Sequence, residues 1–171
     1  MSDINLIVPK ILKYEGGYVN NPHDLGGCTN MGVTLAAWQH LGHPTATCED
    51  IKNLTKDDFK MVLRQYWNMW QADRINNQSV AEILVDWVWG SGVWGIKIPQ
   101  RILGVVADGQ VGDKTIQALN AANQAELYAK IFQARKDFIS QIVANNPSQN
   151  IFLKGWMNRL NDFKFIESVI A

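Results

Sequence analysis

The sequence predicts a mainly α-helical protein, and two observations support this fold class. Apolar residues recur at the spacing of an amphipathic helix in several segments, and Gly, Asn or Pro residues punctuate the chain between them. Strand-like alternation is weak outside residues 16–33, a Gly-rich region that we expect to form a structured turn or short irregular hairpin after the first helix. Hydrophobic residues make up 47 % of the 171, which is enough for a core and excludes a disordered chain.

The helices are expected in the following order. The first covers 4–15, where Pro9 implies that the helix starts late or bends. The second begins at Thr34, a good N-cap, and closes at Gly42. A third starts near Thr55. Further helices are expected over 79–89, after Thr115, over 123–144 and around Trp156 and Leu160.

Two regions are expected within one compact unit. Gly90-Ser91-Gly92 interrupts the helical pattern, so the chain divides into 1–92 and 93–171. Because no long linker separates them, we expect the two regions to pack together. The oligomeric state is not encoded in any pattern, and a monomer is favoured.

Composition excludes several function classes. The formal net charge is zero and no basic run occurs, so neither nucleic acid nor an anionic membrane is an expected partner. No stretch is long enough to span a membrane, and residues 1–18 lack the pattern of a secretory signal, so synthesis in the cytoplasm is expected. Two free thiols are favoured over a bridge between Cys28 and Cys48, and no metal or other cofactor is expected.

Glu15 stands out by its position. With a rotation of about 100° per residue, it falls about 20° from Ile4, within the stripe that contains Val8 and Ile11. Partial burial favours the protonated form of a carboxyl group, which is the form that a general acid needs. Periodicity alone leaves open a solvent-facing Glu at a frayed helix end, or one paired with an Arg.

The residues around Glu15 resemble those of glycoside hydrolase family 108. Members of that family carry an EGGY motif near the N-terminus, and EGGY stands here at 15–18. The segment 85–92, VDWVWGSG, is similar to the family's D-x-x-x-N-x-G segment, with Trp89 in place of the Asn. The segment 102–119, with its LG, DG and AL pairs, is similar to the family's predicted peptidoglycan-binding region.

This resemblance implies a lysozyme-like helical fold and an N-acetylmuramidase with Glu15 as the essential catalytic residue. Such an enzyme cleaves peptidoglycan glycan strands between N-acetylmuramic acid and N-acetylglucosamine, for phage-type lysis or for wall remodelling during protein secretion. It would act in the periplasm or cell wall after release by a holin-like or other export partner.

A second catalytic group is expected close behind Glu15. Glycosidic cleavage uses an acid on one side of the bond and a base or anion on the other. Eight residues separate Glu15 from Asp24, and four separate Asp24 from Thr29, which is one residue shorter at the Thr than in phage-type lysozymes. Asp24 is the candidate second group and Thr29 a candidate for orienting water, with an Asx-turn and a turn hydroxyl as the alternatives. By analogy we favour an inverting reaction.

The candidate substrate contacts are polar, aromatic or glycine residues near these motifs: Tyr18, Gly26, Gly27, Asp86, Trp89 and Trp94. Core packing is the alternative for each aromatic residue, and a buried hydrogen-bonding acid is the alternative for Asp86. Two rival functions remain open at this point. One is a lytic transglycosylase, which also uses a single Glu, and the other is a non-catalytic peptidoglycan-binding protein.

Overall fold

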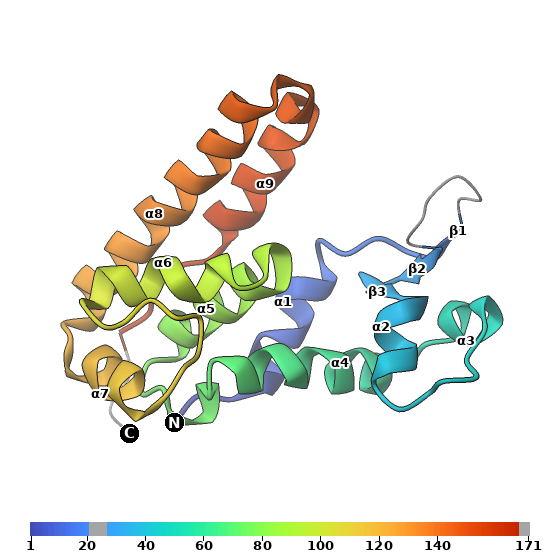
Figure 1. Ribbon diagram of the computed structural model, residues 1–171, viewed down its shortest axis with the longest axis horizontal. Helices are drawn as coiled ribbons and strands as arrows, with labels where there is room; N and C mark the ends of the chain where they lie inside the picture. The colour runs from blue at the N-terminus through green and yellow to red at the C-terminus, as the bar shows by residue number, and fades with distance from the viewer. Residues whose placement is uncertain (21–26, 168–171) are drawn as a thin grey trace. The chain divides into compact units, whose positions relative to one another are not determined.

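The structure, a computed structural model, describes residues 1–20 and 27–167 and is mainly helical, as predicted (Figure 1). Three short strands are β1 (Val19–Asn20), β2 (Cys28–Asn30) and β3 (Val33–Thr34). The α-helices are α1 (Val8–Leu12), α2 (Leu35–His40), α3 (Cys48–Lys52), α4 (Lys56–Met69), α5 (Gln78–Ser91), α6 (Trp94–Leu103), α7 (Asp113–Ala121), α8 (Gln124–Asn145) and α9 (Asn150–Asp162). Single 3₁₀ turns lie at Ile4–Leu6, Ala72–Arg74 and Pro147–Gln149.

The chain forms two compact units. The N-terminal unit is Ile4–Tyr66, and the C-terminal unit comprises Met1–Asp3 with the chain from Trp67 onward. Helix α4 carries the chain from one unit into the other. None of the helices within 1–20 and 27–167 combines the length and the apolar character needed to cross a membrane.

Helix α1 begins late because of Pro9. The proline lies in the first turn, where its missing N–H is not needed, and a 3₁₀ turn precedes it. Beyond Leu12, the N–H groups of Tyr14 and Glu15 both donate to the Ile11 carbonyl, at 2.9 and 3.2 Å. The helical path therefore continues to Glu15, while Ile11 is fully buried.

The Gly-rich region contains the predicted hairpin. Strands β1, β2 and β3 form an antiparallel sheet in that order, with Val19 opposite Thr29 and Asn30 opposite Val33. Met31 and Gly32 join β2 to β3, and their φ angles of 51° and 75° are those of a two-residue type I′ turn. This turn sets the register that places Thr29 in the middle strand.

A disulfide bridge between Cys28 and Cys48 corrects the expectation of two free thiols. The two Cα atoms lie 5.7 Å apart, which is within the normal range for a bridge. The pairing could not be read from the sequence because the hairpin and α2 bring the two cysteines together across 20 positions. Asn30 reinforces the same junction by donating to the carbonyls of Ile51 and Lys52, at 3.0 and 3.2 Å. Strand β2 is thus fastened to α3 at both of its ends.

In the C-terminal unit, α5 is the central helix. Its residues from Ser79 to Val88 are all buried. It packs against α6 and α8, and α8 packs in turn against α9. Helix α6 was not expected from the sequence, because Pro99 lies inside it.

Candidate active site

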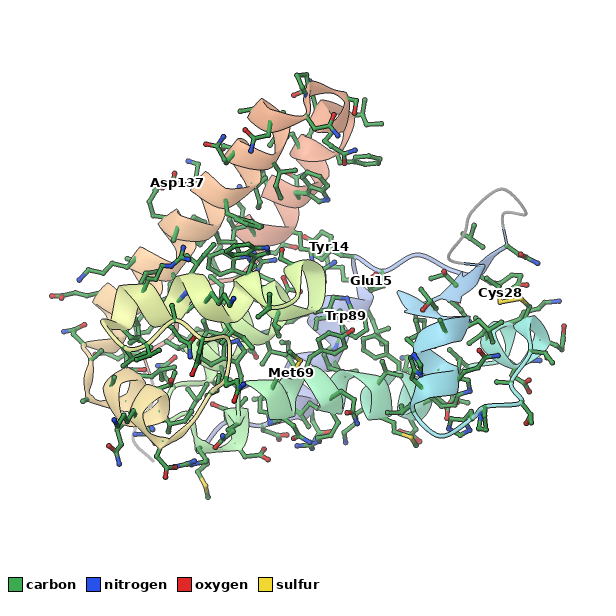
Figure 2. All side chains as sticks on the ribbon, viewed as in Figure 1. Tyr14, Glu15, Cys28, Met69, Trp89 and Asp137 are labelled. Atoms are coloured by element: carbon green, nitrogen blue, oxygen red, sulfur yellow. A yellow bond between two sulfur atoms is a disulfide. The ribbon has the colours of Figure 1, made fainter. Side chains whose placement is uncertain are left out.

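Glu15 lies at the end of the first helical segment, where the chain turns towards the sheet (Figure 2). Its backbone N–H is still held by the Ile11 carbonyl, so the helix fixes the position of its Cα. The residue is half-buried. Gly16 and Gly17 follow, and no neighbouring atom lies within 4 Å of the position that a Cβ would take at either glycine. The backbone that leads from Glu15 to β1 is therefore not covered by other side chains at these two positions.

The hairpin is tied directly to the segment that carries Glu15. The N–H of Met31 donates to the Gly16 carbonyl at 3.1 Å. Thr29 lies two residues before Met31, in the strand between Val19 and Thr34. Successive side chains of a strand point to opposite faces. Because Cys28 and Asn30 face α3, the half-buried Thr29 side chain lies on the other face of β2.

The other candidate residues of the Gly-rich region have mixed outcomes. Asp24 and Gly26 lie outside the described residues, in the connection between β1 and β2. Gly27 has a φ of 68° and leads into β2. Tyr18 is 37 % exposed just before β1, so its ring is accessible from solvent. The structure therefore brings the backbones around Glu15 and Thr29 together, while the role of Asp24 stays a prediction.

Asp86 occupies a position unlike that of a substrate contact, which corrects the expectation for this residue. Its side chain is 0 % exposed. One oxygen accepts from Arg135 Nη2 at 2.5 Å, and the other accepts from Arg159 Nη2 at 2.7 Å. A buried carboxylate with both oxygens engaged joins α5 to α8 and α9 and has no oxygen to offer a sugar.

The two tryptophans of the C-terminal unit differ in exposure. Trp89 is half-buried near the end of α5. Trp94 is 47 % exposed at the start of α6, with the Lys97 ammonium 5.9 Å from its ring centroid. An exposed indole face is the requirement for stacking on a sugar ring. The stacking role of Trp94 stays a prediction.

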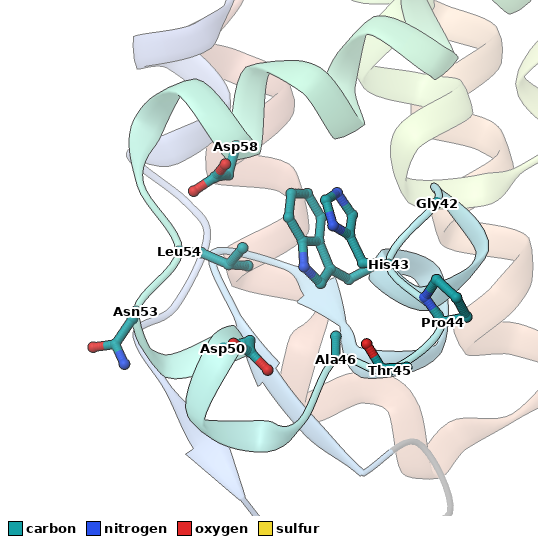
Figure 3. A pocket seen from close by; sticks show the side chains of 10 residues that line it. Gly42, His43, Pro44, Thr45, Ala46, Asp50, Asn53, Leu54 and Asp58 are labelled. Carbon is teal, nitrogen blue, oxygen red and sulfur yellow. The ribbon is translucent and has the colours of Figure 1, made fainter.

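The N-terminal unit contains a cavity that no pattern in the sequence indicated. It measures about 440 Å³ and is shown in Figure 3. The His43 ring stacks on the Trp38 indole, with centroids 4.0 Å apart. The two carboxylates that line this cavity, Asp50 and Asp58, cap helices. Each accepts hydrogen bonds from the N–H and the hydroxyl of the Thr three residues earlier. The hydrogen bonds from Thr47 hold the pKa of Asp50 below its ordinary value.

Within residues 1–20 and 27–167, no group of three or more His, Cys, Asp or Glu side chains is placed to hold a metal ion.

Two family models match the chain. The model described as "Glycosyl hydrolase 108" matches residues 8–92, and the model described as "Predicted Peptidoglycan domain" matches residues 94–161. The chain belongs to glycoside hydrolase family 108. A solved structure entitled "Structure of Brucella abortus SagA" is similar to it, with a TM-score of 0.78 and 29 % sequence identity over 94 % of this chain and 90 % of that one. No curated protein matches the chain.

Family 108 membership and the second match together identify a peptidoglycan-related glycoside hydrolase. The boundary between the two family matches falls at Val93, whereas the compact units divide between Tyr66 and Trp67. Helix α5 therefore belongs to the hydrolase match in sequence and to the C-terminal unit in space.

Proposed function

We propose that this family 108 hydrolase is an N-acetylmuramidase, which cleaves peptidoglycan glycan strands between N-acetylmuramic acid and N-acetylglucosamine. The observation that carries the proposal is the placement of Glu15. It is half-buried at the end of a helical segment, within the EGGY sequence. The next residue, Gly16, is hydrogen-bonded to the hairpin that contains Thr29.

The proposed mechanism uses Glu15 as the general acid. It donates a proton to the glycosidic oxygen as the bond to the sugar carbon breaks. Asp24 is the proposed second group, which activates water or stabilises the positive charge on the far side of the sugar. Thr29 is proposed to orient that water through its hydroxyl. In this scheme water attacks from the opposite face, and the reaction inverts the anomeric centre.

Digestion of purified sacculi by the wild-type protein and by Glu15→Gln tests the proposal. Products are reduced with borohydride and identified by mass spectrometry. We expect reduced N-acetylmuramic acid ends from the wild type. Because the amide cannot donate the required proton, the rate should fall by about 10² to 10⁴ in Glu15→Gln. Circular dichroism should show an unchanged helix content, since the Glu15 backbone keeps its hydrogen bond.

Glu49→Gln is the matched control. Glu49 is an exposed residue of α3 in the same unit, so the same chemical change there should leave the digestion rate unaltered. Anhydro ends from the wild type would make the protein a lytic transglycosylase instead. Sacculi that are bound by the wild type but never cut would make it a non-catalytic binding protein.

We also propose that the protein acts in the periplasm or cell wall after release by another factor, such as a holin-like or other export partner, because its substrate lies outside the cytoplasmic membrane. Bacteria that express it in the cytoplasm should grow normally and lyse when the membrane is permeabilised. Lysis without permeabilisation would contradict the need for a separate release step. The same experiment with Glu15→Gln separates wall cleavage from toxicity of the chain itself.

A further inference from the structure

A cavity of about 170 Å³ lies among α5, α8 and α9, entirely within the C-terminal unit. It is separate from the residues assigned above to proton transfer, which belong to the N-terminal unit. Helix α5 provides one wall, and α8 and α9 provide the others. The lining residues are Trp87, Gly90, Ser91, Arg135, Ile139, Ile142, Trp156 and Arg159.

The charged residues that line this cavity are both cationic. Arg135 and Arg159 each present a guanidinium group, and no acidic side chain is among the lining residues. The carboxylate of Asp86 lies behind them, fully buried, with both oxygens already accepting from these two arginines. The wall of the cavity is therefore positively charged, which favours an anionic occupant.

One buried donor at the cavity, the Nε1 of Trp87, has no acceptor among the residues that the structure describes. Arg135 is 7 % exposed. Its Nη2 donates to Asp86, and its Nη1 donates to the Ile83 carbonyl at 3.4 Å. Trp87, which carries the unmatched donor, is 1 % exposed. Leaving such a donor unmatched is unfavourable.

We propose that this cavity binds a carboxylate carried on a small apolar group. A guanidinium and an indole N–H both donate to carboxylate oxygens, and the planar guanidinium suits the carboxylate in particular. Ile139, Ile142 and Trp156 supply an apolar wall for a methyl or short alkyl group. The identity that we assign to this ligand rests on the proposed function. Peptidoglycan peptides end in alanine, whose terminal carboxylate and methyl group have this chemistry.

Titration of the full chain with N-acetyl-D-alanine, followed by NMR, tests the inference. The control ligand is N-acetyl-D-alanine amide, which has the same apolar body and no charge. We expect saturable shifts for residues that line the cavity with the acid. The amide should bind at least about tenfold more weakly, since the charge-assisted hydrogen bonds are lost. Inorganic phosphate at the same concentration distinguishes a general anion site from a carboxylate site.

Two variants separate the cavity from the rest of the unit. Trp87→Phe removes the indole donor and keeps an aromatic ring, and we expect it to weaken binding of the acid by about tenfold. Ile142→Trp places a larger side chain in the cavity and leaves Asp86, Arg135 and Arg159 themselves unchanged, and binding should be lost. Trp70→Phe is the matched control, because Trp70 is also fully buried with an unmatched Nε1 but does not line the cavity.

Equal binding of acid and amide, equal binding of phosphate, or wild-type affinity in a folded Trp87→Phe would each overturn the inference. Its failure is distinguishable from failure of the proposed function. A protein that cuts sacculi but binds no N-acetyl-D-alanine would refute the cavity assignment alone. A protein that binds the acid with the predicted variant pattern but cuts no sacculus would support the cavity and refute the muramidase.

Discussion

Gly109 combines a left-handed backbone conformation with a close neighbouring side chain. Its φ is +81°, and an added Cβ would lie 2.5 Å from Val93 Cγ2. We expect Gly109→Ala to lower the free energy of unfolding by about 1–3 kcal/mol, because it combines overpacking with a strained backbone. Urea unfolding followed by circular dichroism measures this. Gly112→Ala is the control, since Gly112 has an extended backbone and nothing within 4 Å, so its stability should change little. Equal losses in the two variants would contradict the clash.

Asp108 gives a pH-dependent prediction in the same loop. The N–H of Gln110 and then the side-chain amide of Gln100 hold the pKa of Asp108 below its ordinary value of 3.8. A carboxyl with a lowered pKa in the folded state stabilises the protein above its unfolded pKa. That stabilisation is lost as the pH falls through the folded pKa. The melting-temperature gap between wild type and Asp108→Asn should therefore be present at neutral pH and shrink below about pH 4. A gap independent of pH would refute this.

Single residues differ in how far the sequence could place them. The position of Glu15 at the end of the first helical segment was predictable, because the helical repeat and the EGGY sequence are local signals. Thr34 was predicted as an N-cap, and its hydroxyl oxygen accepts from Ala37 N–H at 3.1 Å. For Asp86, the sequence leaves open both a buried hydrogen-bonding role and a substrate contact, because its partners Arg135 and Arg159 lie 49 and 73 positions away. No local pattern contains such a pairing.

Among the elements, the long amphipathic helices were predicted best. The expected helix over 123–144 is α8, and the one over 79–89 is α5. Two helices were missed. Helix α3 has only 5 residues, which is too short for a periodic pattern. Helix α6 contains Pro99, which local rules place outside helices, yet Pro99 is buried there, so tertiary packing overrides the local preference.

The bridge between β2 and α3 gives a prediction for the elements it joins. Closing a loop of about 20 residues stabilises a protein by about 3 kcal/mol in the chain-entropy description. Reduction with a thiol, or the double change of Cys28→Ser and Cys48→Ser, should therefore speed amide hydrogen exchange in β2 and α3. Exchange in α5 and α8, in the other unit, serves as the internal reference. Faster exchange throughout both units would contradict a local effect.

At the scale of the whole molecule, residues 1–92, which contain the hydrolase family match, are not expected to fold without the rest of the chain. A fragment of residues 1–92 contains Asp86 but loses both arginines that neutralise it. Leaving a buried charge unpaired costs about 3–5 kcal/mol, and α5 also loses α6 and α8. We expect this fragment to be insoluble when produced alone. Co-production with residues 93–171 should restore a soluble complex, as judged by gel filtration. A folded, monomeric 1–92 fragment would refute this dependence.

The ion pairs of Asp86 with Arg135 and Arg159 also limit how the two regions of such a chain can be recombined. A recombination event at Val93 would join the hydrolase region to a new neighbour at the natural boundary of the two family matches. Any new neighbour without cations equivalent to Arg135 and Arg159 would leave the Asp86 carboxylate of α5 without a partner of opposite charge. The two regions are therefore expected to pass from one genome to another together, and exchange of the second region alone would have to carry its arginines along.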